Sequence, residues 1–239
     1  MSDIINQTGA IATNVDLVYC IDGTGSMSPC IEATKKAAKS LHSDIVKALA
    51  GKSRIVQELR LKIIVFRDFS YDDDEAIEES KFFTLPDEIT DCEAFINKIE
   101  AKGGGEEPES ALEALHLAFN SKWKESLQGD FKRRHVVVLF TDASAHKLND
   151  VTYREKAETN DLYPNDVPRD LNEFMNEWDE KMDDTAKRLV IFAPDAVPWN
   201  EFGTKLDQCM ITYARAGAGL NDVTNQAIME MISSSILQQ

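Results

Sequence analysis

Short hydrophobic runs alternate along the chain with longer stretches in which apolar residues recur at helical spacing. Four of the runs are almost continuously apolar, and strands of that kind lie in the middle of a parallel sheet that helices cover on both faces. The intervening segments are long enough to supply those helices. We therefore predict six strands, namely Val15–Ile21, Leu59–Phe66, Lys81–Thr84, His135–Thr141, Lys187–Ala193 and Met210–Ala214.

The segments between these strands predict an α/β architecture in which the last helix packs on its own sheet. One apolar face of that helix is formed by Ile228, Met231, Ile232 and Ile236. The segment 67–80 is too short for a helical crossover, which indicates that the third strand is antiparallel at the sheet edge. The predicted helices are Pro29–Ala50, Asp91–Ile99, Pro108–Trp123, Arg169–Met182 and Asn221–Ile236.

The length of 239 residues favours a single domain. Residues 1–14 precede the first predicted strand, and we expect an N-terminal extension there. Residues 142–169 are the longest stretch without clear periodicity, and we expect an ordered surface excursion. Because this excursion directly follows a strand end, and long loops in compact domains are often functional, we expect it near a binding site.

The composition disfavours several classes of function. With 26 basic and 42 acidic residues the formal charge is -16, which argues against binding to nucleic acid. No apolar run is long enough to span a bilayer, so we expect no membrane insertion. The cysteines are scattered and the first residues lack the features of a signal peptide, so we expect reduced thiols and a cytoplasmic location.

The segment Val18–Pro29 ends a predicted buried strand with one carboxylate, three hydroxyls and two glycines. Open α/β sheets bind ligands at this end of their strands. A dinucleotide site is disfavoured because Asp22 would lie beside the pyrophosphate and no acidic residue follows at the ribose position. Aspartyl phosphoryl transfer is disfavoured because Cys20 stands where the nucleophilic carboxylate is required.

A divalent cation is the third chemistry that this segment allows. The spacing Asp22-x-Thr24-x-Ser26 turns alternate side chains of an extended turn toward one point, and hard oxygen ligands suit Mg²⁺. Asp142 ends a second buried strand, and residues 103–109 open a helix with a cluster of carboxylates after three glycines. We expect these three loops to meet at one crevice.

With these motifs the chain resembles a von Willebrand factor A domain that carries a metal ion-dependent adhesion site. Asp22-x-Thr24-x-Ser26 is similar to the family motif DxSxS or DxTGS, and Asp142 fits the aspartate of its third loop. The middle loop resembles the GGGDxPE variant, with Glu106 in place of the aspartate.

Three further segments are most similar to the A domains that are joined to alpha-type protein kinases. They are Phe66–Asp68, Thr141–Ala143 with His146, and Asp161–Pro164. No kinase domain follows within the 239 residues.

The resemblance implies a Rossmann-like three-layer sandwich. Its mostly parallel six-stranded sheet has the order 3-2-1-4-5-6 with strand three antiparallel, and its site lies between strands one and four. The resemblance also implies Mg²⁺ or Mn²⁺ as cofactor and a partner protein that completes the coordination with its own carboxylate. The implied metal ligands are Asp22, Thr24, Ser26, Glu106 and Asp142.

We accordingly expect a cytoplasmic, metal-dependent protein-binding module and not an enzyme. A metal-dependent phosphohydrolase and a regulatory subunit that recruits substrates to a separate protein kinase are the alternatives. Glu107 and Glu109 have a simpler explanation as acids at a helix N-terminus, and we leave His146 out of the site. We expect Tyr153 and Tyr163 on the rim that faces the partner.

Overall fold

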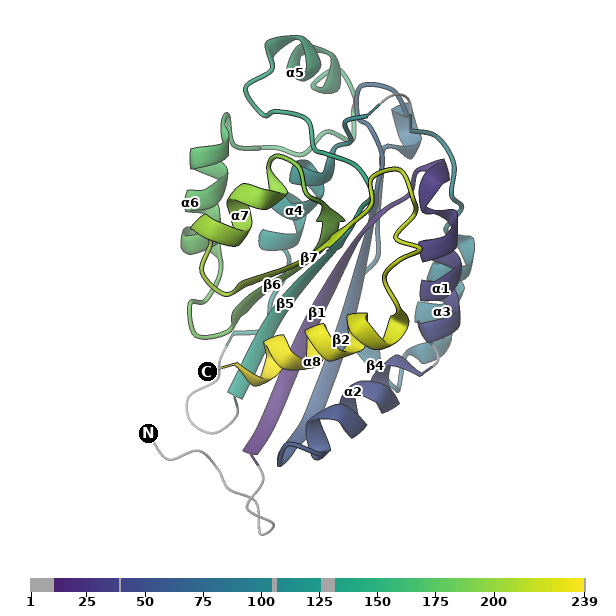
Figure 1. Ribbon diagram of the computed structural model, residues 1–239, viewed down its shortest axis with the longest axis vertical. Helices are drawn as coiled ribbons and strands as arrows, with labels where there is room; N and C mark the ends of the chain where they lie inside the picture. Colours follow the sequence, from purple (N-terminus) through teal and green to yellow (C-terminus); the bar gives the residue numbers. More distant parts are fainter. Residues whose placement is uncertain (1–10, 39, 105–106, 126–131, 239) are drawn as a thin grey trace.

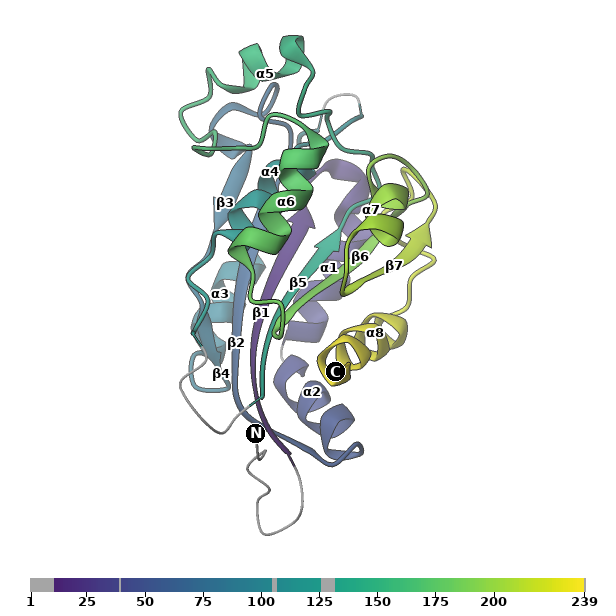
Figure 2. The same ribbon diagram turned by 90° about the vertical axis from the view of Figure 1, so that its left-hand side faces the viewer.

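The computed structural model describes residues 11–38, 40–104, 107–125 and 132–238. In these ranges the chain forms one mixed sheet with helices on both faces (Figures 1 and 2). The strands are β1 (Ile11–Asp22), β2 (Arg54–Phe66), β3 (Ile77–Glu79), β4 (Phe83–Leu85), β5 (Lys132–Phe140), β6 (Lys187–Pro194) and β7 (Cys209–Ala214).

The sheet order is β3-β2-β1-β5-β6-β7, with β4 also paired to β2. β1, β2, β5, β6 and β7 run parallel, as the continuous hydrophobic runs predicted. The Rossmann-like order implied by the family resemblance is therefore confirmed, with the first and fourth strands of the prediction side by side at the centre.

The antiparallel edge differs from the prediction in one respect. Two short strands, β3 and β4, replace the single third strand, so the described sheet has seven strands instead of six. Between them Ser80 binds β2 with both of its groups: its amide donates to Ile63 O and its hydroxyl accepts from Ile63 N, each at 2.9 Å. A side chain here takes the place of a backbone carbonyl, which interrupts the edge strand.

Two helical layers enclose the sheet (Figures 1 and 2). One layer contains α1 (Ser28–Ala38), α2 (Leu41–Ala50), α3 (Ile89–Lys98) and α8 (Asn225–Leu237). The other contains α4 (Ala111–Phe119), α6 (Leu171–Lys181) and α7 (Trp199–Lys205), while α5 (Val151–Ala157) lies beyond the carboxyl ends of the strands.

The central strand β1 shows why both faces are covered. Leu17, Tyr19 and Ile21 point into the core under α1, α2, α3 and α8. Val18 and Cys20 point into the core under α4, α6 and α7. Because side chains alternate along a strand, a continuous apolar run needs a helical layer on each side.

The helices differ from the prediction in two places. The stretch predicted as one helix, Pro29–Ala50, contains α1 and α2, because α2 turns to bury Leu41, Ile45 and Leu49 beside α8. The short helices α5 and α7 were not predicted, and α5 falls within the segment 142–169. Among the described residues, no helix combines the length and the apolar character needed to cross a membrane.

Candidate metal centre

The carboxyl ends of β1 and β5 lie side by side at the centre of the sheet. The chain leaves β1 toward one side of the sheet and leaves β5 toward the other. The two strands pair in parallel, with Ile21 opposite Phe140. β2 lies on the far side of β1, and β6 lies on the far side of β5. At such a switch point the loops turn away from each other and leave a crevice for a ligand. Asp22 ends β1 and Asp142 follows β5 at this crevice.

Asp22 is fully buried and is held by three donors. Its Oδ1 accepts from the amide of Thr24 at 2.9 Å and from the hydroxyl of Thr24 at 2.6 Å. Its Oδ2 accepts from the hydroxyl of Thr141 at 2.7 Å. Burial raises the pKa of Asp22 to about 6, although these hydrogen bonds act in the opposite direction.

Asp142 is also buried, and its contacts bring a further loop to the crevice. Its Oδ1 accepts from the hydroxyl of Ser26 at 2.9 Å, and its Oδ2 accepts from the amide of Gly219 at 2.7 Å. The hydroxyls of Ser26 and Thr24 lie 3.4 Å apart. Two hydrogen-bonded pairs, Asp22 with Thr24 and Asp142 with Ser26, therefore meet at the contact between the two hydroxyls and bring four of the five predicted site residues together. The fifth, Glu106, lies outside the described residues.

These oxygen atoms are of the kind that a hard divalent cation prefers as ligands. Two carboxylates from different strands face each other across two hydroxyls, and the hydroxyl oxygens keep lone pairs for a cation while their protons point to Asp22 and Asp142. Within the described ranges no three carboxylate, imidazole or thiolate groups lie close enough to form a metal cluster alone. A cation held by the described residues would therefore need the hydroxyls of Thr24 and Ser26 as well as the carboxylates.

Arg67 organises the loops around the crevice, a role that the sequence did not indicate. Its guanidinium is fully buried and donates to Gly23 O at 3.2 Å, just after β1. It also donates to Lys102 O at 2.9 Å, at the start of the glycine-rich loop, and to Glu75 O at 2.6 Å. Arg67 thus fixes the glycine-rich loop against the end of β1.

Glu109 lies beside the crevice, whereas the sequence analysis assigned it only to a helix terminus. It is 4% exposed, and its Oε2 has no hydrogen-bond partner. Burial, together with the charges of Asp22 and Asp68, raises the pKa of Glu109 to about 9. The burial of Glu109 could have been inferred from the sequence of α4. That helix is apolar almost all round, so it is expected to be buried together with the residues just before it.

Gly104 explains how Glu109 reaches the crevice. Gly104 has a φ of +73°, and a Cβ on it would lie 2.6 Å from Thr24 Cγ2 and 3.1 Å from Glu109 Oε1. Only glycine tolerates both this backbone conformation and this close approach. The side chains of Thr24 and Glu109 therefore lie against the same backbone atom.

The expectation that Tyr153 faces a partner is wrong. Tyr153 is 6% exposed, and its hydroxyl donates to Glu113 Oε1 at 3.0 Å. Tyr163 is half-buried and donates to the same oxygen at 3.3 Å. A fully buried carboxylate needs such donors, and so both tyrosines anchor the segment 142–169 to α4. His146 stacks on Tyr153, with ring centroids 3.7 Å apart, and its Nε2 lies 3.2 Å from Asp68 Oδ2.

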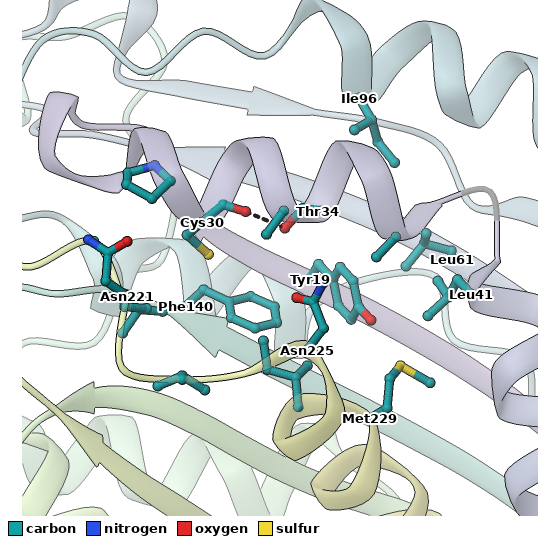
Figure 3. A pocket seen from close by; sticks show the side chains of 17 residues that line it. Tyr19, Cys30, Thr34, Leu41, Leu61, Ile96, Phe140, Asn221, Asn225 and Met229 are labelled. Carbon is teal, nitrogen blue, oxygen red and sulfur yellow. Dashed lines mark hydrogen bonds between the residues drawn. The ribbon is translucent and has the colours of Figure 1, made fainter.

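A separate cavity of about 220 Å³ lies between α1, α8 and the sheet (Figure 3). Tyr19, Leu41 and Met229 are among the side chains that line it. None of the described residues around this cavity carries a carboxylate. Its apolar character sets it apart from the hydroxyls and carboxylates at the crevice.

Comparison with known proteins identifies a family for this chain. A family model described as von Willebrand factor A domain matches residues 16–158. The Alpha-protein kinase vwkA of Dictyostelium discoideum is 29% identical over 160 residues, which is 66% of this chain and 22% of the kinase. The chain thus spans less than a quarter of that relative.

Solved structures share the fold. The pilus adhesin SpaC from Lactobacillus rhamnosus GG matches with a TM-score of 0.55 and 10% identity, over 94% of this chain and 30% of the adhesin. The open conformation of the same adhesin matches with a TM-score of 0.50 and 11% identity, over the same shares of 94% and 30%. At such low identity the likeness concerns the fold alone.

Proposed function

This chain belongs to the von Willebrand factor A domain family, and on that premise we propose that it is a protein-interaction module that binds its partner through a divalent cation. Asp22, Thr24, Ser26 and Asp142 would hold the cation, which is Mg²⁺ or Mn²⁺. The cation supplies a Lewis-acidic anchor for a carboxylate of the partner. Since the chain carries a formal charge of -16, an acidic partner would otherwise be repelled.

The observation that carries this proposal is the pairing of hydroxyls with carboxylates across two strand ends. Thr24 donates to Asp22 and Ser26 donates to Asp142, so that two buried negative charges face one point. Asp22 and Thr24 are buried, whereas Ser26 is exposed. A cation in this crevice would face solvent on the side of Ser26, where a partner can reach it.

Thermal unfolding with and without metal tests the proposal. Millimolar Mg²⁺ or Mn²⁺ should raise the melting temperature of the wild type, because a ligand that binds only the native state stabilises it by mass action. Asp142→Asn should abolish this shift. Asp195→Asn is the matched control, since Asp195 is exposed, follows the next strand end, and lies outside the network. An identical shift in wild type and Asp142→Asn would contradict the proposal.

A second candidate is a regulatory role in which the chain recruits substrates to a separate protein kinase. The similarity to Alpha-protein kinase vwkA favours it, because the matched segment there is 22% of a protein named as a kinase. It uses the same cation and differs in the partner. Immobilised chain should retain kinase activity from an extract of its source cells in Mg²⁺ and release it in EDTA.

A binding role without catalysis is part of the proposal. The thiol of Cys20 donates to Ala114 O at 3.6 Å, and burial raises its pKa far above the usual range, which suits packing better than nucleophilic attack. Phosphate-ester turnover that requires Mg²⁺ and is lost in Asp22→Asn would favour a phosphohydrolase instead. We place the proposed binding function in the cytoplasm, since Cys20 and the other three cysteines are free thiols.

A further inference from the structure

We propose that the amino ends of the central strands carry a second binding site, which takes a small free oxyanion such as phosphate or sulfate. Thr13 on β1, Arg54 on β2 and Arg134 on β5 would hold the anion. The site lies at the opposite end of the sheet from the cation centre. It goes beyond the proposed function and does not depend on it.

Three arginines from three strands point to the same side of the sheet. Arg54 begins β2, Arg134 lies near the start of β5, and Arg188 lies near the start of β6. Each lies two positions before an apolar residue that packs in the core under α1, α2, α3 and α8, namely Val56, Val136 and Val190. Residues two apart along a strand share a face, so the three guanidinium groups lie on the side of α2 and α8.

This cluster of arginines has more positive charge than its surroundings offset. Gln238 O accepts from Nη2 of both Arg134 and Arg188, at 2.5 Å and 2.8 Å, so two guanidinium groups share one oxygen. The carbonyls at the end of α8 carry only partial negative charge. Asp207 acts on Arg188 from a distance but is bound to Lys187. Burial and the charges of Arg188 and Arg54 lower the pKa of Arg134 to about 10.

Arg54 is the arginine of this cluster that lacks a partner. Its side chain is 9% exposed, and its Nη1 has no hydrogen-bond partner among the residues that the structure describes. The hydroxyl of Thr13, a residue that is 2% exposed, has none there either. Buried polar groups without partners are costly. A ligand that accepts from both groups would offset this cost.

The pairing of the strands brings these two groups to one place. Thr13 lies opposite Val56, two positions after Arg54, so Thr13 and Arg54 occupy neighbouring positions on one face. β1 lies between β2 and β5, and Arg134 is opposite Val15 on the other side of β1. Thr13 therefore lies between Arg54 and Arg134. An anion beside Thr13 would be within the field of both arginines.

The chemistry of these donors favours an oxyanion. A guanidinium group presents N–H donors in a planar fork that matches phosphate, and the hydroxyl adds one more donor. Because the side chains are buried, the site suits a small free anion and not a phosphate group on a protein or a lipid. The whole chain has a formal charge of -16 and repels anions at long range, so binding would depend on this local cluster.

Calorimetric titration of phosphate into the 239-residue chain tests the site. Chloride keeps the ionic strength constant, and EDTA prevents phosphate from binding through a metal. Arg54→Gln should weaken phosphate affinity by about tenfold or more, as loss of a hydrogen bond to a charged group does. Arg215→Gln is the matched control, because Arg215 is exposed and follows β7 at the other end of the sheet. Its affinity should stay within about twofold of the wild type, since solvent screens exposed charges.

Melting experiments separate binding from a structural role. In chloride alone, Arg54→Gln and Thr13→Val should melt no lower than wild type, because each loses a buried polar group that has no partner. Phosphate stabilises proteins in general, so the measured quantity is the additional gain of the wild type over each variant, which binding to the native state predicts. Lower melting temperatures in chloride together with equal gains in phosphate would overturn the inference.

The remaining outcomes also decide the matter. Absence of phosphate binding by the wild type, or equal affinity in wild type and Arg54→Gln, would overturn the site. If Arg54→Gln does not fold, Thr13→Val replaces it, since it keeps the volume and removes only the hydroxyl, and unchanged phosphate affinity there would overturn the site as well. Phosphoserine should bind more weakly than inorganic phosphate. Tighter binding of phosphoserine would show that the occupant is not a free oxyanion.

Discussion

At the amino ends of the strands a buried positive charge has several partners in this chain, whereas at the carboxyl ends the buried carboxyl groups have no positive partner among the described residues. Lys187 begins β6, and its side chain is 1% exposed. Its Nζ lies 2.7 Å from Asp179, 2.7 Å from Asp184 and 3.2 Å from Asp207. These contacts overcome the burial and raise the pKa of Lys187 to about 12.

Two arginines at the amino ends of the strands donate hydrogen bonds to carbonyls at the end of α8. Arg134 donates to the carbonyl of Ile236 at 2.9 Å, and Arg188 donates to the carbonyl of Ser235 at 3.0 Å. The carbonyl end of a helix carries partial negative charge, so guanidinium groups are favourable there. These charges hold α8 on the sheet.

Asp22, Asp142 and Glu109 at the carboxyl ends have no such counter-charge. Within the described ranges, hydroxyl and amide groups bind Asp22 and Asp142, and none of the three carboxylates forms an ion pair. Lys187, Arg134 and Arg188 are thus paired within the described part of the chain, whereas these three carboxyl groups have no positive partner there. The proposed cation would supply that positive charge.

The largest effect should come from breaking the amino-end cluster. Lys187→Met removes three charge-assisted contacts, and the relief of burying the ammonium offsets part of that loss, so the free energy of unfolding should fall by about 3 kcal/mol. Urea denaturation measures the change. Lys205→Met is the control, because Lys205 forms an exposed pair with Glu201, and its loss should cost at most about 1 kcal/mol. Equal effects in both variants would remove the distinction between the two ends of the strands.

A slightly smaller effect, with a dependence on metal, is expected at the carboxyl ends. Asp22→Asn in EDTA should leave the free energy of unfolding unchanged or raise it, because one of two facing negative charges is gone. Wild type should gain about 2.7 kcal/mol when Mg²⁺ is at 100 times its Kd, and the variant should gain none. Denaturation in EDTA and in Mg²⁺ gives both values. A large loss in EDTA would show that the carboxylates serve the fold.

The smallest effect is expected from removing one aspartate of the cluster around Lys187. Asp179→Asn removes one of three partners of Lys187, and Asp179 is 68% exposed. The change should cost about 0.5 kcal/mol or less, because solvent screens the charge and two aspartates remain. The same urea experiment measures it. A cost close to that of Lys187→Met would mean that a single ion pair carries the cluster.

Much of the fold was predictable because it depends on residues that are close in sequence. The apolar run of β1 predicted a buried central strand, and Asp22 at its end predicted a polar group at the crevice. The break at Ser80 was not predictable, since it depends on hydrogen bonds to Ile63 in a neighbouring strand. The burial of Tyr153 likewise depends on Glu113 in another element.

The sequence by itself determined the five parallel strands, their α/β alternation and the hydroxyls and carboxylates that follow β1 and β5, because these depend on short-range periodicity. It did not distinguish Glu109 from its acidic neighbours, since all of them lie before one helix and after the same glycines. Only the tertiary structure decided that Glu109 is buried against the loop of Thr24 and that Arg67 holds this loop in place. Burial is a property of contacts between distant segments, and local sequence does not contain it.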